Sequence, residues 1–408
     1  MLKKITVAQL KLGMHIHEFC GSWMDHPFWR EDFILSDLAD LQAIQTCGIQ
    51  ELWIDVQKGC DVAVAGETRQ ESEARIDATL VRIAQPKEPP PKVSMAEEVA
   101  RAKKICVTAK SAVVSMFQEV RMGKAIDHDA AGALVEEITD SVLRNPGALI
   151  SLARLKSADD YTYMHSVAVC ALMVALARQL GIDDRTTREA GMAGLLHDLG
   201  KANMPLEVLN KPGKLTDEEF HIIQSHPAEG HRMLVEAGAV GAIPLDVVLH
   251  HHEKVDGSGY PKGLKADEIS LFAKMGAVCD VYDAITSNRP YKAGWDPAES
   301  IRKMTEWSKG HFDERVFHAF VKSIGIYPIG SLVRLESGRL GIVVDQTERS
   351  LLTPKVRIFF STRSSTHITP EVVDLSLPGC GDKIVSREDP AKWNFPNLDQ
   401  PWGTVDLF

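Results

Sequence analysis

The chain has 408 residues, 44% of them hydrophobic and 25% charged, which is the ordinary composition of a soluble globular protein with room for two or three domains. It contains no run of about eighteen apolar residues, and Met1-Leu2-Lys3-Lys4 leads into no continuous apolar segment, so we expect neither a membrane span nor a secretory signal. The net charge of −10 argues against a surface for duplex nucleic acid, and seven cysteines scattered without pair spacing favour reduced thiols in a cytoplasm.

Residues 1–65 are predicted to form a small α+β domain. Short Val- and Ile-rich segments near its two ends favour strands, and a helix is expected over Ser36–Thr46 with Ser36 as its N-cap. Residues 66–95 are charged and end in the proline-rich stretch Pro86–Pro91. Because proline stops helices and stiffens extended chain, this stretch predicts a semi-rigid linker.

A long helix is expected from Ala96 onward, at the start of a domain that covers residues 96–328. Its apolar residues recur at alternating spacings of three and four, as in a heptad seam. The seam consists of Val99, Ala102, Cys106, Ala109, Val113, Met116 and Val120. Two interpretations stay open: a coiled-coil stalk that joins two copies of the chain through residues 96–120, or an amphipathic helix that packs on its own domain.

The rest of this domain is predicted to be helical almost throughout. A helix over about residues 161–180 is apolar on nearly all sides, so it should be buried. A helix over 187–199 is expected to end at Gly200 in a left-handed cap. Pro227 should break another helix at His226.

Two further helices carry candidate site residues. One begins at Pro244 and runs into the three histidines His250, His251 and His252, and another over about 270–286 carries Asp280. Beyond Pro328 the sequence becomes rich in Val and Ile, with Ser337-Gly338 as a hairpin turn. We therefore predict a mainly α protein with a small β appendage over 329–388 and an irregular tail over 389–408.

Histidines and carboxylates gather in the helical part of the sequence. His197-Asp198 and Lys201 form one cluster, and His251-His252-Glu253 opens a Gly/Pro-rich loop. This pattern suits a two-metal hydrolytic site, in which one aspartate bridges two ions about 3.5–4 Å apart. Asp198 is the natural bridge. Successive helical residues point about 100° apart, so the three adjacent histidines cannot all reach one centre.

The loop sequence also carries a resemblance to a known family. The string from His251 through Glu253, Asp256, Gly257, Gly259, Tyr260 and Pro261 resembles the motif of the HD-GYP family, bacterial phosphodiesterases of cyclic di-GMP, and His197-Asp198 resembles the pair that defines the HD superfamily of metal phosphohydrolases. Matching pieces follow in the family's order at Tyr161–Ser166, His226-Pro227, Asp280–Ala284 and Arg289–Lys292. The resemblance covers roughly residues 155–325 and implies an all-helical HD-type domain. Residues 3–60 resemble a small domain of unknown function often found ahead of it.

The resemblance implies how the ligands divide between two ions. One ion would be held by His165, His197 and Asp280, the other by His226, His251 and His252, with Asp198 shared. His250 is left as a helix-surface residue. Some family members have a glutamate that supports a third metal at the position of Tyr161, so we predict two ions here. Iron is the expected metal, with manganese as an alternative and zinc left open.

The remaining motif residues receive supporting roles. Lys201 is placed to contact the scissile phosphate, and Arg289 and Lys292 resemble the family's basic pair near the substrate phosphates. Glu253 is expected to orient a ligand histidine, and Asp283 to support the site. Gly257, Gly259 and Pro261 should shape the loop, and Tyr260 should cover the pocket or dock a GGDEF-domain partner.

The leading hypothesis is an enzyme in which a hydroxide between the two ions attacks a phosphodiester, converting cyclic di-GMP to pGpG and, in an open alternative, on to GMP. A phosphodiesterase for 3',3'-cyclic GMP-AMP is a second hypothesis. A third, from another class, is a sensor that binds a cyclic dinucleotide without hydrolysing it. The intact set of ligands argues against the sensor, and replacing Asp198 with alanine would separate the classes.

Overall fold

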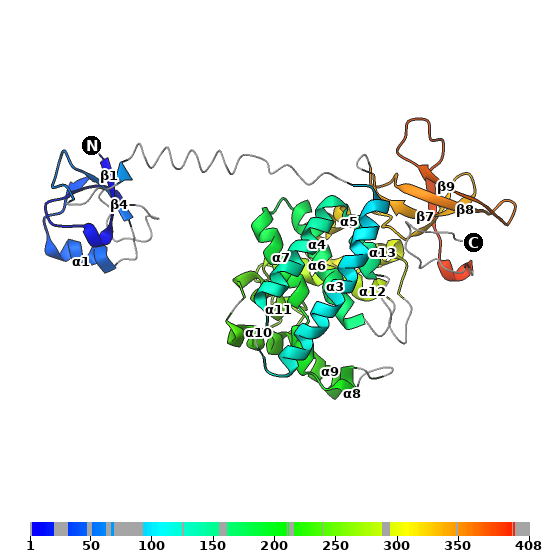
Figure 1. The fold of residues 1–408 in the computed structure, drawn as a ribbon, viewed down its shortest axis with the longest axis horizontal. Helices are drawn as coiled ribbons and strands as arrows, with labels where there is room; N and C mark the ends of the chain where they lie inside the picture. Colours follow the sequence, from blue (N-terminus) through cyan, green and yellow to red (C-terminus); the bar gives the residue numbers. More distant parts are fainter. Residues whose placement is uncertain are drawn as a thin grey trace. The chain divides into compact units, whose positions relative to one another are not determined.

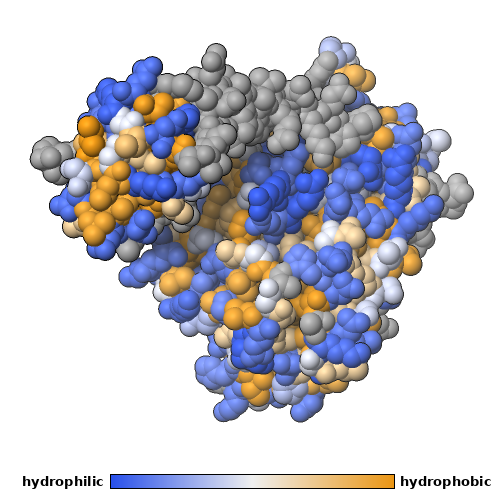
Figure 2. Space-filling view, turned by 60° about the vertical axis from the view of Figure 1, so that its left-hand side comes forward, coloured by the Kyte–Doolittle hydropathy of each residue, from blue (hydrophilic) through white to orange (hydrophobic). Residues whose placement is uncertain are grey.

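The computed structural model describes residues 2–19, 32–46, 51–62, 67–68, 93–124, 126–154, 161–209, 211, 216–238, 240–287, 294–347, 350–393 and 395. The chain forms two compact units, Met1–Pro89 and Pro90–Phe408, which are drawn along the sequence from blue to red in Figure 1. No helix of the described ranges is long and apolar enough to cross a membrane. On the face seen in Figure 2, apolar residues are interspersed with hydrophilic ones.

The first unit is a small α+β fold, as predicted. Its five-stranded antiparallel sheet has the order β3-β2-β4-β1-β5. The elements are β1 (Leu2–Thr6), η1 (Val7–Gln9), β2 (His15–Phe19), β3 (Phe33–Ile34), α1 (Leu38–Thr46), β4 (Glu51–Asp55) and β5 (Glu67–Thr68). Its core includes Ile16, Ile44 and Ile54. The helix begins two residues later than Ser36 suggested, because Asp37 accepts the hydrogen bond from the Ala39 N–H.

The second unit opens with the long helix α3 (Met95–Arg121), which begins with a capping box between Ser94 and Glu97. The predicted seam is buried, apart from half-buried Cys106, in one core with α4 (His128–Arg144), α5 (Pro146–Arg154) and α6 (Tyr161–Gln179). Burial within the chain's own domain explains the apolar repeat without a coiled coil. The seam therefore packs the helix on its own domain, as the second interpretation expected, and a homodimer through residues 96–120 stays a prediction.

Helix α6 lies at the centre of the helical body and contacts α5, α7, α12 and α14. Its residues from Met164 to Ala177 are buried on all sides, as the uniformly apolar sequence predicted. The other helices are α7 (Asp184–Leu196), η3 (Leu199–Asn203), α8 (Leu206–Leu209), α9 (Asp217–Gln224), α10 (His226–Ala237), α11 (Ala242–His250), α12 (Leu271–Thr286), α13 (Pro297–His311) and α14 (Glu314–Ile324).

The structure corrects the predicted role of Gly200. It does not end α7 in a left-handed cap, because α7 stops at Leu196 and Gly200 lies inside η3. A Cβ atom at Gly200 would lie 1.9 Å from the His226 carbonyl oxygen and 2.6 Å from the Gly230 nitrogen. Glycine is needed here because the backbones of η3 and α10 touch, which places Asp198 beside His226.

Pro227 also acts differently from its prediction. The chain breaks between α9 and α10 at Ser225, and Pro227 stands in the first turn of α10 rather than beyond the end of α9. Proline is well suited to a first helical turn because its missing N–H has no partner there. His226 therefore begins a helix, with its backbone held by that helix and its ring directed inward.

A second antiparallel sheet follows the helices, as the change in composition predicted. Its strands are β6 (Leu332–Leu335), β7 (Arg339–Asp345), β8 (Lys355–Ser361), β9 (Thr366–Asp374) and β10 (Ile384–Arg387), in the order β10-β6-β7-β8-β9. Gly338, with a φ of +81°, makes the predicted turn between β6 and β7. The sheet has its own core, which includes Val343 and Phe359, and a short helix η4 (Pro390–Lys392) follows it.

Candidate metal centre

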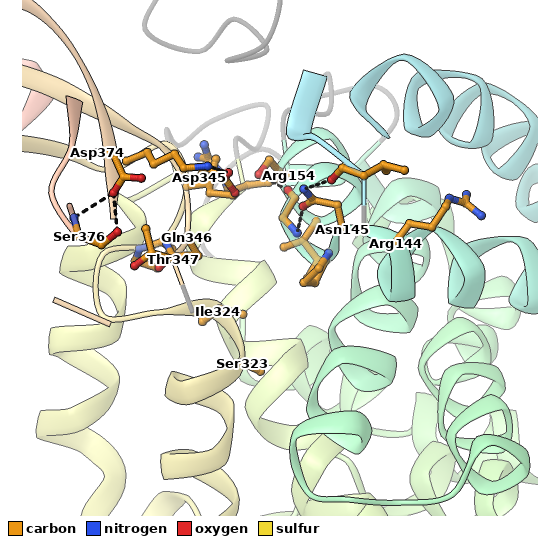
Figure 3. Close-up of a pocket in the computed structure, with 18 of the residues that line it drawn as sticks. Arg144, Asn145, Arg154, Ser323, Ile324, Asp345, Gln346, Thr347, Asp374 and Ser376 are labelled. Carbon is orange, nitrogen blue, oxygen red and sulfur yellow. Dashed lines mark hydrogen bonds and ion pairs between the residues drawn. The ribbon is translucent and has the colours of Figure 1, made fainter. Parts of the chain in front are cut away.

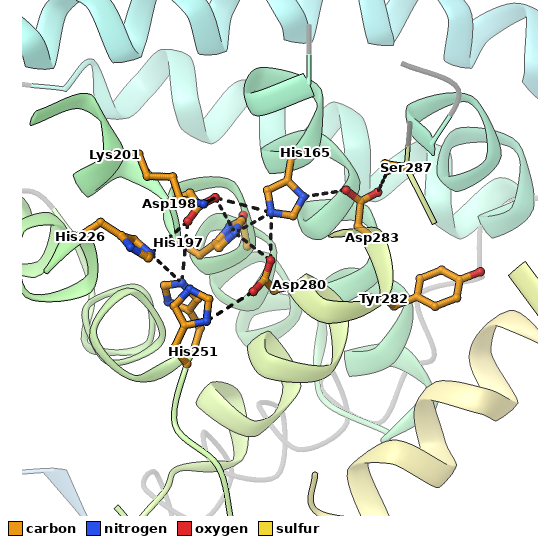
Figure 4. A network of polar contacts seen from close by, with 12 residues as sticks. His165, His197, Asp198, Lys201, His226, His251, Asp280, Tyr282, Asp283 and Ser287 are labelled. Atoms are coloured by element: carbon orange, nitrogen blue, oxygen red, sulfur yellow. Dashed lines mark hydrogen bonds and ion pairs between the residues drawn. The ribbon is translucent and has the colours of Figure 1, made fainter. Parts of the chain in front are cut away.

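The helical body brings together all seven side chains that the sequence suggested as metal ligands (Figure 4). They come from the buried helix α6, the junction of α7 and η3, the start of α10, the end of α11 and the middle of α12. Their ligand atoms form two groups, within each of which the atoms lie within 4.8 Å of one another. One group is His165, His197 and Asp280, and the other is Asp198, His226, His251 and His252.

Asp198 lies between the two groups. Its Oδ1 atom is 3.2 Å from Nε2 of His226, while its Oδ2 atom is 3.4 Å from Nε2 of His197 and 3.5 Å from Nε2 of His165. The Oδ1 atom is buried and has no hydrogen-bond partner among the described residues. A buried carboxylate oxygen without a partner is costly, and a cation facing it would remove that cost. The donor set therefore fits divalent metal ions.

Each of four histidines is oriented by a partner at its outer nitrogen. Such a partner fixes the ring so that Nε2 faces the centre. The Nδ1 contacts are His165 to Asp283 Oδ2 at 2.6 Å, His197 to the Gly194 carbonyl at 2.8 Å, His226 to the Ile223 carbonyl at 2.6 Å and His251 to the Val247 carbonyl at 3.0 Å. The inner Nε2 atoms of these rings lie close together in two pairs. The Nε2 atoms are 3.2 Å apart in His165 and His197 and 3.3 Å apart in His226 and His251.

The electrostatics favour ionised carboxylates at Asp198 and Asp280 and a neutral imidazole at His252, which are the forms that bind metals. Burial raises the pKa of Asp198, but Lys201, His197 and His226 outweigh burial and hold it well below its usual range. Burial likewise opposes ionisation of Asp280, and contacts with His165 and His252 hold its pKa well below the usual value. Burial lowers the pKa of His252 to about 3.

Lys201 lies directly beside the carboxylate of Asp198. Its Nζ atom is 2.5 Å from Asp198 Oδ2, and its side chain stays partly exposed. A cation placed at the edge of the centre can reach both Asp198 and an incoming anion. His250, by contrast, lies outside both ligand groups and contacts Asp246 Oδ1 at 2.8 Å. Its side chain is only 11% exposed, so it is packed into the helical body and does not lie on the helix surface as predicted.

The loop after α11 packs tightly against the ligand histidines. The ring of Tyr260 stacks on the ring of His252, with centroids 4.7 Å apart. The backbone N–H of Tyr260 donates to the His252 carbonyl at 3.2 Å. A Cβ atom at Gly259 would lie 2.4 Å from the Lys254 nitrogen, so only glycine fits. Gly257 has a φ of +84°, and the bond between Tyr260 and Pro261 is cis. Gly257 and Gly259 thus occupy backbone positions that favour glycine.

The structure corrects the role of Glu253. It was expected to orient a ligand histidine, but its two carboxylate oxygens accept hydrogen bonds from the backbone N–H groups of Lys262 at 2.7 Å and Leu264 at 3.0 Å. Glu253 is buried and thus holds the loop that carries Tyr260. Asp283 is the carboxylate that contacts a ligand ring, through His165.

Some predicted residues lie outside the described part of the chain. Arg289 and Lys292 are among them, and so is the side chain of Tyr161. Sequence reasoning also missed the carbonyl groups of Gly194, Ile223 and Val247, which orient three of the histidines. No sequence signal could have revealed them, because a backbone carbonyl is the same in every residue.

Comparisons with known proteins agree with this arrangement. Residues 143–316 match the HD domain family, and residues 2–131 match a domain of unknown function (DUF3391), which therefore extends beyond the predicted boundary at 65 into the helical unit. The cyclic di-GMP phosphodiesterase PA4108 of Pseudomonas aeruginosa is 56% identical over 404 residues, covering 98% of this chain and 96% of the relative.

Two further relatives match the helical part alone. The cyclic di-GMP phosphodiesterase response regulator RpfG of Xanthomonas campestris is 37% identical over 182 residues, which are 42% of this chain and 47% of the relative. The 3'3'-cGAMP-specific phosphodiesterase 1 of Vibrio cholerae is 33% identical over 177 residues, which are 43% of this chain and 41% of the relative. Since the Pseudomonas relative is matched over nearly its whole length, this chain belongs to the HD-GYP family of HD-domain phosphohydrolases.

Proposed function

We propose that this protein is a metal-dependent phosphodiesterase that hydrolyses cyclic di-GMP to linear pGpG. The observation that carries the proposal is the position of Asp198, whose two oxygens face two separate histidine groups. The 56% identity to a full-length relative with that name supports the substrate. A cyclic dinucleotide has two phosphodiester bonds, and hydrolysis of one of them gives the linear product.

The metal ligands in this proposal are the seven clustered side chains, with Asp198 shared. Two divalent ions bound there would supply an acidified water molecule and neutralise charge on the phosphoryl oxygens. Lys201 would contact the scissile phosphate from beside Asp198, and its cation would favour the charge that develops during hydrolysis. We propose Arg289 and Lys292 as further phosphate contacts. Tyr260, stacked on His252, would close the edge of the site.

Iron is the metal we propose, with manganese as the alternative and zinc still open. Imidazole-rich sites bridged by a carboxylate suit these metals, and affinity alone does not separate them. With tyrosine at position 161, we propose two ions rather than three. A site of this kind is expected to release pGpG as its main product, with conversion to GMP as the slower alternative.

The second candidate substrate is 3',3'-cyclic GMP-AMP. It is favoured by the relatives of that specificity in Vibrio cholerae, which are 33% and 34% identical over the helical part. Cyclic di-GMP remains the first proposal because the relative matched over nearly the whole chain carries that name.

The test is a turnover assay with anaerobically purified protein loaded with Fe(II) or Mn(II). Cyclic di-GMP and cyclic GMP-AMP are supplied separately, and products are separated by chromatography. Metal-dependent pGpG that is absent with Asp198→Ala, in a variant whose circular dichroism matches the wild type, would support the proposal. Tight binding of the dinucleotide without any product under either metal would instead indicate a sensor.

Two proposals concern the protein's surroundings. The partly exposed loop at Gly257–Pro261 is the surface we propose for a GGDEF-domain partner, and a pull-down with a Tyr260→Ala control would test it. A cytoplasmic location is favoured by the thiols: Cys60, Cys106, Cys170, Cys279 and Cys380 are all free.

A further inference from the structure

A pocket lies between the helical body and the C-terminal sheet (Figure 3). Its volume is about 510 Å³, within the range of sites for small molecules. On α12, Asp280 belongs to the metal cluster, whereas the Tyr282 ring points away from the cluster and lines this pocket (Figure 4). The pocket is therefore separate from the metal centre, although both share one helix.

An arginine with a buried, unbonded Nε atom lines this pocket. Arg154 is the last residue of α5, and its Nε atom is buried without a hydrogen bond. Within the described ranges of the chain, its guanidinium forms no ion pair. The other cations of the pocket are occupied, because Arg144 binds Glu98 at 2.8 Å and Lys355 binds Asp345 at 2.8 Å. An unpaired, partly buried guanidinium is unfavourable, and a phosphate or carboxylate would satisfy it with two parallel hydrogen bonds.

A second donor lies near Arg154. Tyr282 is only 3% exposed, and burial raises its pKa, while the positive charge of Arg154 acts in the opposite direction. Both residues line the same pocket. A buried tyrosine hydroxyl that keeps its proton can donate a hydrogen bond to an anion held by the arginine.

The remaining walls suit a planar ring with N–H donors. Ile150, Ile324 and Ile329 provide apolar surface, and the sheet side contributes the carboxylates of Asp345 and Asp374. A carboxylate can accept about four hydrogen bonds, so Asp345 keeps acceptor capacity while it holds Lys355. The adjacent N–H groups of a guanine ring are the kind of donors that such carboxylates accept.

We propose that this pocket binds a guanine mononucleotide, with its 5'-phosphate at Arg154 and Tyr282 and the N–H edge of its base at Asp345 and Asp374. The choice of guanine rests on the proposed function, since hydrolysis of cyclic di-GMP yields products with a guanine base and a 5'-phosphate. The pocket would then sense the end product of the protein's own reaction or of a following hydrolysis step.

The test is calorimetric titration of GMP into the metal-free full-length protein, so that the metal centre cannot bind the phosphate through its ions. We expect one GMP per chain for the wild type and at least tenfold weaker binding for Arg154→Met. Arg185→Met is the matched control, because Arg185 has an 89% exposed side chain away from the pocket, and it should bind GMP like the wild type. Guanosine, which lacks the phosphate, and AMP, whose base lacks the adjacent N1–H and 2-amino donors of guanine, should both bind more weakly.

Equal affinity of wild type and Arg154→Met for GMP, or no binding to the wild type, would overturn the proposal. If Arg154→Met loses its native circular dichroism, Tyr282→Phe replaces it, with an expected loss of about threefold to tenfold. The cyclic di-GMP turnover assay on the same preparation separates the two proposals. Turnover without GMP binding rejects the pocket alone, whereas Arg154-dependent GMP binding without turnover rejects the proposed reaction.

Discussion

The carboxylate of Asp283 holds the ring of His165 from outside the metal centre, with Oδ2 2.6 Å from Nδ1. Its other oxygen accepts a hydrogen bond from the Ser287 hydroxyl at 3.2 Å, so the carboxylate itself is fixed. His165 is thereby oriented with Nε2 3.0 Å from Asp280 Oδ1. A pair of this kind both aligns a ligand ring and makes its inner nitrogen more basic.

The first prediction concerns this pair. Asp283→Asn should lower metal affinity or turnover by about 10- to 100-fold, because an amide supports the ligand ring less well than a carboxylate. Metal content after dialysis and kcat would be measured on the same preparation. His250→Asn is the control, since His250 also contacts an aspartate but lies outside both ligand groups. Unchanged metal binding in Asp283→Asn would show that His165 needs no such support.

The second prediction concerns the close approach of η3 and α10. Gly200→Ala should displace the backbone at His226, because the added Cβ would meet its carbonyl oxygen at 1.9 Å. We expect a loss of stability of about 1–3 kcal/mol and a clear loss of turnover. Gly132→Ala is the control, since a Cβ there meets nothing within 4 Å on α4, and it should be neutral or slightly stabilising. Urea unfolding would measure the stability of both variants, and a turnover assay their activity. Equal stability and turnover of the two variants would contradict the prediction.

The third prediction concerns the loop that carries Tyr260. Glu253→Gln should remove one of the two hydrogen bonds that the side chain accepts from the backbone N–H groups of Lys262 and Leu264. We expect the free energy of unfolding to fall by about 1–3 kcal/mol, because a buried amide NH2 group replaces an oxygen and cannot accept a hydrogen bond. Hydrogen exchange over residues 255–264 should become faster. Glu268→Gln is the control. It alters an exposed carboxylate that accepts a hydrogen bond from the Lys265 backbone N–H, and it should leave hydrogen exchange over residues 255–264 unchanged. Equal exchange in both variants would contradict the assigned role.

The fourth prediction concerns pH and the buried Glu98 on α3. Burial raises its pKa, but Arg144 and Ser141 outweigh burial and place the pKa below the ordinary value of 4.5. Because the folded state lowers the pKa, the stabilisation is present above pH 4.5 and is lost as the pH falls through the folded-state value.

Glu98→Gln tests this directly. The substitution removes one partner of the ion pair between Glu98 and Arg144, and it should lower the free energy of unfolding by about 3–5 kcal/mol near neutral pH. The stability of the variant should also decrease less than that of the wild type as the pH falls below 4.5, because the variant lacks this titrating carboxylate. Glu97→Gln is the neighbouring control, because that carboxylate is exposed and accepts hydrogen bonds from the exposed cap residue Ser94. Thermal unfolding over pH 3–7 would measure both effects, and parallel curves for wild type and Glu98→Gln would contradict the assignment.

The sequence by itself determined which side chains gather in the candidate metal centre. Histidine and aspartate are common metal ligands, and their order along the chain matched a known motif. It also determined that the helix over residues 161–179 is buried, because apolar residues cover all its sides. The change to Val- and Ile-rich segments after residue 328 likewise predicted the second sheet.

Only the tertiary structure decided which partner each of these residues has. The apolar repeat of α3 is the same for a coiled coil and for packing on its own domain, and contacts with α4, α5 and α6 selected the second. From the sequence, Glu253 and Asp283 were equally plausible as carboxylates that orient a histidine ring. In the structure, Glu253 accepts hydrogen bonds from backbone N–H groups, and Asp283 contacts His165. The physical reason is that these contacts join residues distant in sequence, so they depend on packing geometry that local patterns do not contain.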